Sequence, residues 1–153
     1  MSLKKILVVC LGNICRSPMA EGILRDRIKK AGKKAIVDSA GTSDYHNGAT
    51  PDLRAVKILI QKGIDISGLA ARNFTVRDFD DFDFIYAMDF SNYMNIISKA
   101  RNEDDKSKVA MIMDVVSPGN NRSVPDPFYG GLEGFDEVYE MLDEAAKKIA
   151  EKL

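Results

Sequence analysis

Two residues with complementary chemistry lie close together near the start of this sequence. Cys10 carries a thiol that can act as a nucleophile, and Arg16 carries a guanidinium that can bind two oxygens of one phosphate group. Between them lie Gly12 and Asn13, residue types that readily adopt left-handed backbone angles and can turn amide groups toward a common centre. The pattern indicates a loop that binds an oxyanion beside a reactive sulfur.

The segments on either side of this loop favour the same interpretation. Residues 5–9 are an apolar run that predicts a buried strand, and residues 18–31 predict a helix with Ser17 as its N-terminal cap. A loop that ends at a helix N-terminus offers N–H groups and a positive dipole end to an anion, and these favour a thiolate at Cys10. The expected phosphate-binding residues are Leu11, Gly12, Asn13, Ile14, Cys15 and Arg16.

Cysteine and histidine are scarce, which limits the other kinds of chemistry. The sequence contains two cysteines, Cys10 and Cys15, and one histidine, His46. A structural zinc site uses four such ligands, so we expect no metal and no cofactor. His46 lies in a polar loop segment, where a solvated surface residue is more common than a catalytic base. A cysteine nucleophile must then be activated by the loop; the simpler alternative is a structural cysteine in a tight turn.

Short β-branched runs alternate with helical patterns along the chain. This predicts an α/β fold with a doubly wound, four-stranded parallel sheet flanked by helices, and a phosphate-binding loop after the first strand. In such sheets ligands bind beyond the carboxyl ends of the strands, where Cys10 lies. We expect strands at 5–9, 35–40, 84–88 and 109–113, helices at 18–31, 50–62, 91–100 and 135–151, and loops at 101–108 and 117–134.

Three helices show further sequence signals. Thr50 is the expected cap of the second helix, whose inner face is marked by Leu53, Val56 and Ile60, and Ser91 is the expected cap of the third. The last helix carries an apolar stripe with helical spacing. Its members are Phe135, Val138, Leu142, Ala145 and Ile149.

Length, composition and charge exclude several broad classes of protein. The chain has 153 residues, of which 45% are apolar and 29% are charged, and its formal net charge is −1. This length suits one domain, which we expect to span residues 1–153. The near-neutral charge argues against nucleic acid or an anionic membrane as a partner. No run approaches the roughly 18 apolar residues of a membrane span, and residues 6–11 are too short for a signal peptide. We expect a cytoplasmic enzyme or binding domain; the oligomeric state is left open.

Longer motifs resemble the low molecular weight protein tyrosine phosphatases. The matching segments are Val9-Cys10-Leu11-Gly12-Asn13-Ile14-Cys15-Arg16-Ser17-Pro18, Asp38-Ser39-Ala40-Gly41-Thr42, Met88-Asp89 and Asp126-Pro127-Phe128-Tyr129-Gly130. Their order agrees with the family along nearly the whole chain. The resemblance implies metal-independent hydrolysis of phosphotyrosine in proteins, or of small phosphate monoesters, through a phosphocysteine intermediate.

The resemblance also implies catalytic roles. Cys10 matches the nucleophile, Arg16 the phosphate clamp and Asp126 the general acid and base. Asp126 lies in the long loop before the last helix, a position from which a carboxyl group can reach a bound substrate. Asp89, at the end of the third strand, is its nearest rival and is expected to be a supporting residue.

Further matches concern the support of the loop. Ser17 resembles the hydroxyl that hydrogen-bonds the cysteine sulfur, and Asn13 and Ser39 resemble a pair that braces the loop. Cys15 resembles a second cysteine that can form a disulfide with the nucleophile under oxidation. Some eukaryotic members add a histidine to the brace, whereas residues 68–69 of this sequence, in the aligned region, are Gly-Leu.

Aromatic residues are candidates for the walls of a substrate pocket. Tyr45, Phe128 and Tyr129 could flank the ring of a phosphotyrosine, or they could simply cover the core.

Two other functions are alternatives to hydrolysis. Arsenate reduction would need further cysteines to relay electrons, and a phosphotyrosine-binding module would be expected to lack the nucleophile or the acid.

Overall fold

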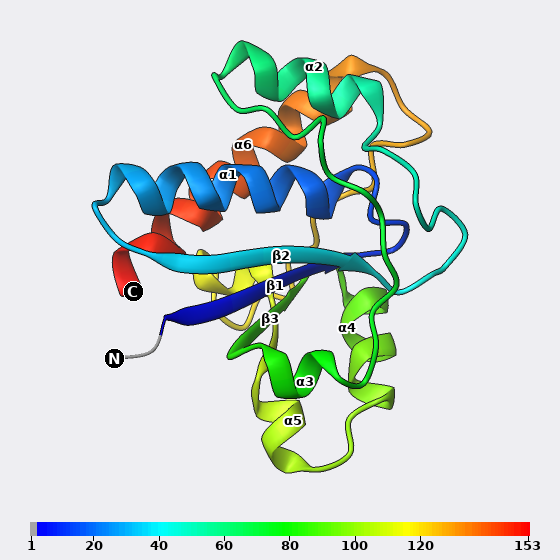
Figure 1. Ribbon diagram of the computed structural model, residues 1–153, viewed down its shortest axis with the longest axis vertical. Coiled ribbons are helices and arrows are strands. Elements are labelled where there is room, and N and C mark those ends of the chain that lie inside the picture. The colour runs from blue at the N-terminus through cyan, green and yellow to red at the C-terminus, as the bar shows by residue number, and fades with distance from the viewer. Residues whose placement is uncertain (1–2) are drawn as a thin grey trace.

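A four-stranded parallel sheet forms the centre of the computed structural model, which describes residues 3–153 (Figure 1). The strands are β1 (Lys4–Cys10), β2 (Ala35–Gly41), β3 (Phe84–Ala87) and β4 (Val109–Met111), and their order in the sheet is β2-β1-β3-β4. The predicted doubly wound parallel fold is therefore confirmed, and each strand overlaps the predicted run, although β4 ends at Met111, two residues before its predicted end.

Helices cover both faces of this sheet. On one face lie α1 (Arg16–Lys30), α2 (Leu53–Gln61) and α6 (Leu132–Lys152), and on the other lie α3 (Asp78–Asp81), α4 (Phe90–Ser98) and α5 (Glu103–Ser107) (Figure 1). A short 3₁₀ helix, η1 (Ile112–Val115), follows β4. Within residues 3–153, no helix combines the length and the apolar character needed to cross a membrane.

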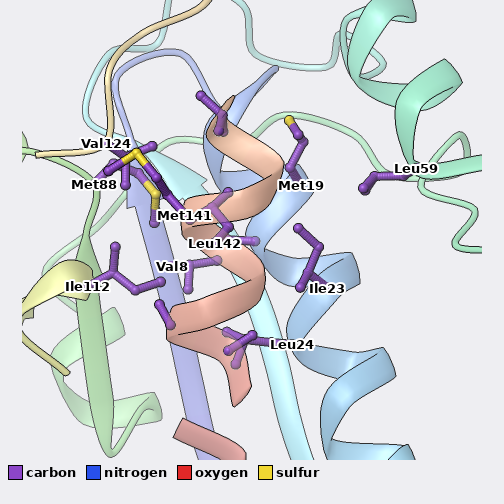
Figure 2. Close-up of a cluster of buried hydrophobic side chains, with 14 of the residues drawn as sticks. Val8, Met19, Ile23, Leu24, Leu59, Met88, Ile112, Val124, Met141 and Leu142 are labelled. Atoms are coloured by element: carbon purple, nitrogen blue, oxygen red, sulfur yellow. The ribbon is translucent and has the colours of Figure 1, made fainter. Parts of the chain in front are cut away.

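The alternation of side chains along β1 explains why both faces are covered. Ile6 and Val8 belong to the core under α1 and α6, whereas Leu7 and Val9 belong to the core on the α3 and α4 side. Figure 2 shows the first of these cores, in which Val8 lies among side chains from α1 and α6 such as Ile23 and Leu142. Because β1 is buried on both faces, its apolar run is continuous, as in other parallel sheets.

The strand order brings Cys10 to a topological switch point. The chain leaves β1 for β2 on one side and then crosses back to β3 on the other side of β1. Connections that diverge in this way open a crevice at the carboxyl end of the central strand. Cys10, the last residue of β1, stands at that end.

Aspartates, rather than the expected hydroxyl residues, begin two of the helices. Asp52 caps α2 in place of Thr50, and its carboxylate accepts a hydrogen bond from the N–H of Arg54 at 2.9 Å. Asp89 caps α4 in place of Ser91 and accepts from the N–H of Asn92 at 2.7 Å. A carboxylate at this position also interacts favourably with the helix dipole.

One helix that was not predicted, one helix start and one predicted helix face differ from the sequence-based expectations. Helix α5 lies within the expected loop 101–108, because Asn102 caps it by accepting from the N–H of Asp105 at 2.8 Å. Helix α6 begins at Leu132, three residues earlier than expected, although its apolar stripe is buried as predicted. Helix α2 buries Ala55, Ile58 and Leu59, so its expected inner face is wrong and Leu53 is 81% exposed.

A close approach between α1 and the segment after α2 gives a test of the packing. A methyl group on Gly22 would lie 2.5 Å from Cγ2 of Ile66 and 3.0 Å from Cγ2 of Ile64, both on stiff, buried β-branched side chains. We expect Gly22→Ala to lower the free energy of unfolding by about 1–3 kcal/mol through overpacking, although alanine favours helix by about 1 kcal/mol. The measurement is urea denaturation.

Gly68→Ala is the matched control, because a methyl group there meets no atom within 4 Å. Its free energy of unfolding should change by no more than about 0.5 kcal/mol. Equal effects of the two substitutions would contradict the tight packing at Gly22.

Candidate active site

The segment between β1 and α1, residues 11–15, forms a turn around the sulfur of Cys10; we call it the phosphate loop. Asn13 has a φ angle of 56°, as predicted, and its backbone N–H donates to Cys10 Sγ at 3.3 Å. Gly12 does not have a positive φ, so that expectation is wrong. A Cβ atom on Gly12 would lie 2.9 Å from Cδ2 of His46, so a larger residue at this position would displace that ring.

A chain of buried hydrogen bonds holds the phosphate loop in this shape. Asn13 Nδ2 donates to Ser17 Oγ at 2.7 Å and to Ser39 Oγ at 3.0 Å. Ser39 Oγ in turn donates to the buried carboxylate of Glu21 at 2.7 Å. Since Ser17 Oγ accepts from Asn13, its own proton can point to Cys10 Sγ, which lies 3.1 Å away.

Helix α1 therefore begins differently from the prediction. It starts at Arg16, with Cys15 at the cap position, and among the described residues no side chain caps it. Ser17 is inside the helix and faces the sulfur. The N–H groups of the first helical turn are left for another acceptor, which is the arrangement of helix termini that bind anions.

A backbone amide completes the brace of Asn13. The N–H of Arg72 donates to Asn13 Oδ1 at 3.0 Å, and the carbonyl of Arg72 accepts from the N–H of Gly41 at 2.8 Å. The guanidinium of Arg72 pairs with Asp38 and Asp78, at 3.1 Å each. The third partner of the Asn13 side chain thus comes from residue 72, not from residues 68–69, and it is a main-chain group that sequence reasoning could not identify.

Arg16 is fixed at the floor of the site. Its side chain is buried, and Nη1 donates to Asp89 Oδ2 at 2.7 Å and to the carbonyl of Val124 at 3.0 Å. Burial alone would lower the pKa of Arg16, but the negative charges of Cys10 and Asp89 more than compensate and raise it. The guanidinium is therefore a permanent positive charge beside the sulfur.

Cys15 differs chemically from Cys10, although both are free and buried. Burial raises the pKa of the Cys15 thiol far above its ordinary value, and the nearby carboxylate of Asp52 raises it further. Cys15 is consequently a neutral thiol at neutral pH, without the character of a nucleophile.

A cavity of about 480 Å³ opens above Cys10. It brings together the expected nucleophile, arginine, acid and aromatic walls, which belong to segments far apart in the sequence. Asp126 lies in the segment 125–131, which we call the acid loop, and its Oδ2 is 3.6 Å from Nη2 of Arg16. The lining residues are Cys10, Leu11, Gly12, Ile14, Cys15, Arg16, Ser43, Tyr45, His46, Asp126, Phe128 and Tyr129.

The aromatic residues stand around the mouth of the cavity. Phe128 is half-buried, whereas Tyr45 is 85% exposed and Tyr129 is 92% exposed. The rings of Phe128 and Tyr129 meet edge to face with centroids 4.9 Å apart. Because Tyr45 and Tyr129 are so exposed, they do not cover the core, and the alternative interpretation of these two rings is wrong.

His46 and Ser43 are site residues that sequence reasoning missed. His46 is half-buried, and its ring centroid lies 5.1 Å from that of Tyr45 and 6.1 Å from that of Phe128. The expectation of a solvated surface histidine is thus wrong. The contact between His46 and Gly12 arises from the return of the chain after β2, and no local sequence signal announces it.

Comparisons with known proteins agree with this geometry. The family model described as low molecular weight phosphotyrosine protein phosphatase matches residues 5–153. A putative low molecular weight protein-tyrosine-phosphatase of Synechocystis is 45% identical over 151 residues, covering 97% of this chain and 96% of that protein.

The chain belongs to the low molecular weight phosphotyrosine protein phosphatase family.

Solved structures of the family support the same assignment. A protein tyrosine phosphatase of Entamoeba histolytica superimposes with a TM-score of 0.91 and is 38% identical, covering 97% of this chain and 96% of that one. The arginine phosphatase YwlE gives a TM-score of 0.88 at 27% identity, covering 97% of this chain and 95% of that one. The protein is therefore an enzyme of the protein-tyrosine-phosphatase class, a group of hydrolases.

The hydrogen bonds of Asn13 lead to a prediction about anion binding. Asn13→Ala removes the side-chain contacts to Ser17, Ser39 and Arg72. With each contributing about 1 kcal/mol, the phosphate loop should lose its shape and the dissociation constant for inorganic phosphate should rise about 10-fold or more. Isothermal titration calorimetry measures this constant.

Asn121→Ala is the control, because Asn121 also has a positive φ, 50°, but is exposed and lies outside the cavity. Both variants lose an asparagine from left-handed backbone, so the control reproduces that part of the change. Because Asn121 is outside the cavity, its variant should bind phosphate with an affinity within about twofold of the starting value. Similar losses in the two variants would mean that backbone strain, and not the network, governs binding.

Proposed function

We propose that this protein hydrolyses phosphotyrosine in proteins, and small aryl phosphates, through a phosphocysteine formed on Cys10. The observation that carries the proposal is the convergence of three groups on one cavity with aromatic walls. They are the Cys10 sulfur, the buried guanidinium of Arg16 and the carboxyl group of Asp126. A nucleophile, a phosphate clamp and a proton donor are the parts that phosphoryl transfer to a thiolate requires.

In the first step the Cys10 thiolate attacks phosphorus. The S–P bond forms as the P–O bond to the tyrosine ring breaks, and Asp126 transfers its proton to the leaving phenolate. Arg16 and the N–H groups of the phosphate loop hold the three other oxygens and stabilise the charge that develops on them. No metal is required in this step, because Arg16 and the amides supply the positive charge.

In the second step water attacks the phosphocysteine. Asp126, now a carboxylate, accepts a proton from the water as the O–P bond forms and the S–P bond breaks. Inorganic phosphate leaves, and the thiolate and the protonated Asp126 are restored. The N–H of Asn13 donates to Cys10 Sγ, and the Ser17 hydroxyl lies 3.1 Å from it. With the hydroxyl proton turned to the sulfur, both groups stabilise the sulfur as it departs with its negative charge.

Two further observations support the covalent route. In the structure of YwlE, a variant with serine in place of cysteine carries a phosphorylated active-site serine, which is a phosphoenzyme of the corresponding kind. The proposed nucleophile must also stay reduced, and both cysteines of this chain are free. A reducing compartment such as the cytoplasm, where we propose that the protein acts, preserves such thiols.

The lining of the cavity favours an aryl phosphate over phosphoarginine, the substrate that the name of YwlE implies. Ile14, Phe128 and Tyr129 offer apolar surface along the path to Cys10. A phenyl ring buries itself favourably against such surfaces, whereas the N–H donors of a guanidinium would lose hydrogen bonds to water there. Among the lining residues, Asp126 is the one carboxylate that could accept hydrogen bonds from those donors.

A phosphopeptide assay tests the proposed function. We expect rapid release of phosphate from a phosphotyrosine peptide, unchanged in the presence of EDTA, and at least about 100-fold slower release from the matching phosphoarginine peptide. Cys10→Ser should lose turnover while it still binds phosphate, because the phosphate loop and Arg16 remain. Faster phosphoarginine hydrolysis would reassign the substrate, and steady turnover by Cys10→Ser would remove Cys10 as nucleophile.

The proton on Asp126 determines the expected pH dependence. Because Asp126 must be protonated for the first step, kcat/KM should fall as pH rises and this carboxyl group ionises. Asp126→Ala should lower the rate about 100-fold or more and flatten that limb of the profile. Asp114→Ala is the control, since Asp114 lies in η1 and does not line the cavity. An unchanged limb in Asp126→Ala would exclude Asp126 as the acid.

A further inference from the structure

The start of helix α2 contacts both loops that line the cavity. On one side, the backbone N–H of Asp52 donates to the carbonyl of Ile14, in the phosphate loop, at 2.8 Å. On the other side, Arg54 Nη2 donates to the carbonyl of Phe128 at 2.8 Å and Nη1 donates to the carbonyl of Gly130 at 2.9 Å, both in the acid loop. One short stretch of chain thus joins the segment around the sulfur to the segment that carries Asp126.

Arg54 is itself held firmly. The carboxylate of Asp52 accepts hydrogen bonds from its Nε at 3.0 Å and its Nη2 at 2.9 Å. The guanidinium carbon lies 4.6 Å from the ring centroid of the fully buried Phe135 and 5.9 Å from that of Phe128. A planar guanidinium that pairs with a carboxylate and lies over aromatic rings has little rotational freedom. Arg54 can therefore hold the two carbonyl groups that it binds in fixed positions.

The acid loop has few other attachments. Just before it, the N–H of Val124 donates to the carbonyl of Met88 at 2.8 Å. Within it, the N–H of Phe128 donates to Asp126 Oδ1 at 3.0 Å, which links the acid to the residue whose carbonyl Arg54 binds. At its end, the carbonyl of Gly131 accepts from the N–H of Gly134, in the first turn of α6, at 3.1 Å. Among residues 3–153, the side-chain hydrogen bonds from another element to the main chain of the acid loop come from Arg54.

We propose that Arg54 is a positioning residue that holds Asp126 over the leaving group. It binds the acid loop through two carbonyls and does not line the cavity, so it acts through Asp126 and not on the phosphate. This inference rests on the proposed function, in which Asp126 protonates the leaving phenolate. Loss of the tether should therefore affect proton transfer to the leaving group and spare anion binding.

Arg54→Lys tests this, because lysine keeps the charge but cannot bind two carbonyls and a carboxylate with one planar group. The substrates are phosphotyrosine, with a basic leaving phenolate, and 4-nitrophenyl phosphate, with a less basic one. We expect kcat/KM to fall about 10-fold or more for phosphotyrosine and less than about 3-fold for 4-nitrophenyl phosphate. The inhibition constant of inorganic phosphate should stay within about twofold, because the phosphate loop and Arg16 are unchanged.

Arg27→Lys is the matched control. Arg27 also forms a two-bond pair with a carboxylate, through Nε and Nη2 to Asp143 at 2.8 and 2.7 Å, but this pair joins α1 to α6 away from the cavity. The ratio of kcat/KM for the two substrates should not change. A change as large as that in Arg54→Lys would show that the effect is general, and would overturn the inference.

The double variant Arg54→Lys, Asp126→Ala separates this inference from the proposed function. Once Asp126 is removed, Arg54→Lys should have no further effect on either substrate. A loss that persists in the Asp126→Ala background, equal losses for both substrates, or weaker phosphate inhibition would overturn the role of Arg54. If Asp126→Ala itself leaves the phosphotyrosine rate unchanged, the general acid of the proposed function falls, and this inference falls with it.

Discussion

The side chain of Asn13 is the constraint on which the geometry of the site depends. A left-handed residue in the middle of the phosphate loop turns a backbone N–H toward Cys10, and three groups hold the side-chain amide of that residue in place. Ser17 and Ser39 accept from Nδ2, and the N–H of Arg72 donates to Oδ1. These partners come from α1, β2 and the segment before α3, so the loop is shaped by the packed fold and not by its own sequence alone.

The site has two parts. The part around Cys10 and Arg16 is rigid, whereas the part around Asp126 is held by contacts with distant segments of the chain. Cys10 lies at the end of the central strand β1, and Arg16 lies at the start of α1, which packs against the sheet. Asp126 lies instead on a partly exposed loop, which approaches the cavity because α2 binds it from one side and Val124 anchors its beginning. Such a division suits the proposed chemistry, in which the oxyanion is held in one geometry while the acid admits the substrate ring and releases the product.

The sequence allowed the sheet, the phosphate loop and the residues around the sulfur to be predicted, because their signals are local. A continuous apolar run, a Gly-Asn turn and a following helix determine where Cys10 and Arg16 stand. The brace from Arg72 was not predictable, because a backbone N–H carries no residue identity. His46 was also missed, since its place against Gly12 follows from how the chain returns after β2. The sequence predicts Thr50 and Ser91 as helix caps, whereas the carboxylates of Asp52 and Asp89 bind the free N–H groups instead.

Asp89 shows how a helix cap can also serve the chemistry. One oxygen of its carboxylate caps α4, while the other accepts from Arg16, so the buried guanidinium has a counter-charge before any substrate arrives. That pairing reduces the cost of burying the arginine and leaves the Nη2 side of the guanidinium toward the cavity, where Asp126 lies 3.6 Å away. A phosphate group bound to Arg16 would take that side and place its own negative charge beside Asp126. In the proposed mechanism, Arg16 thus holds the phosphate group beside the residue that protonates its leaving group.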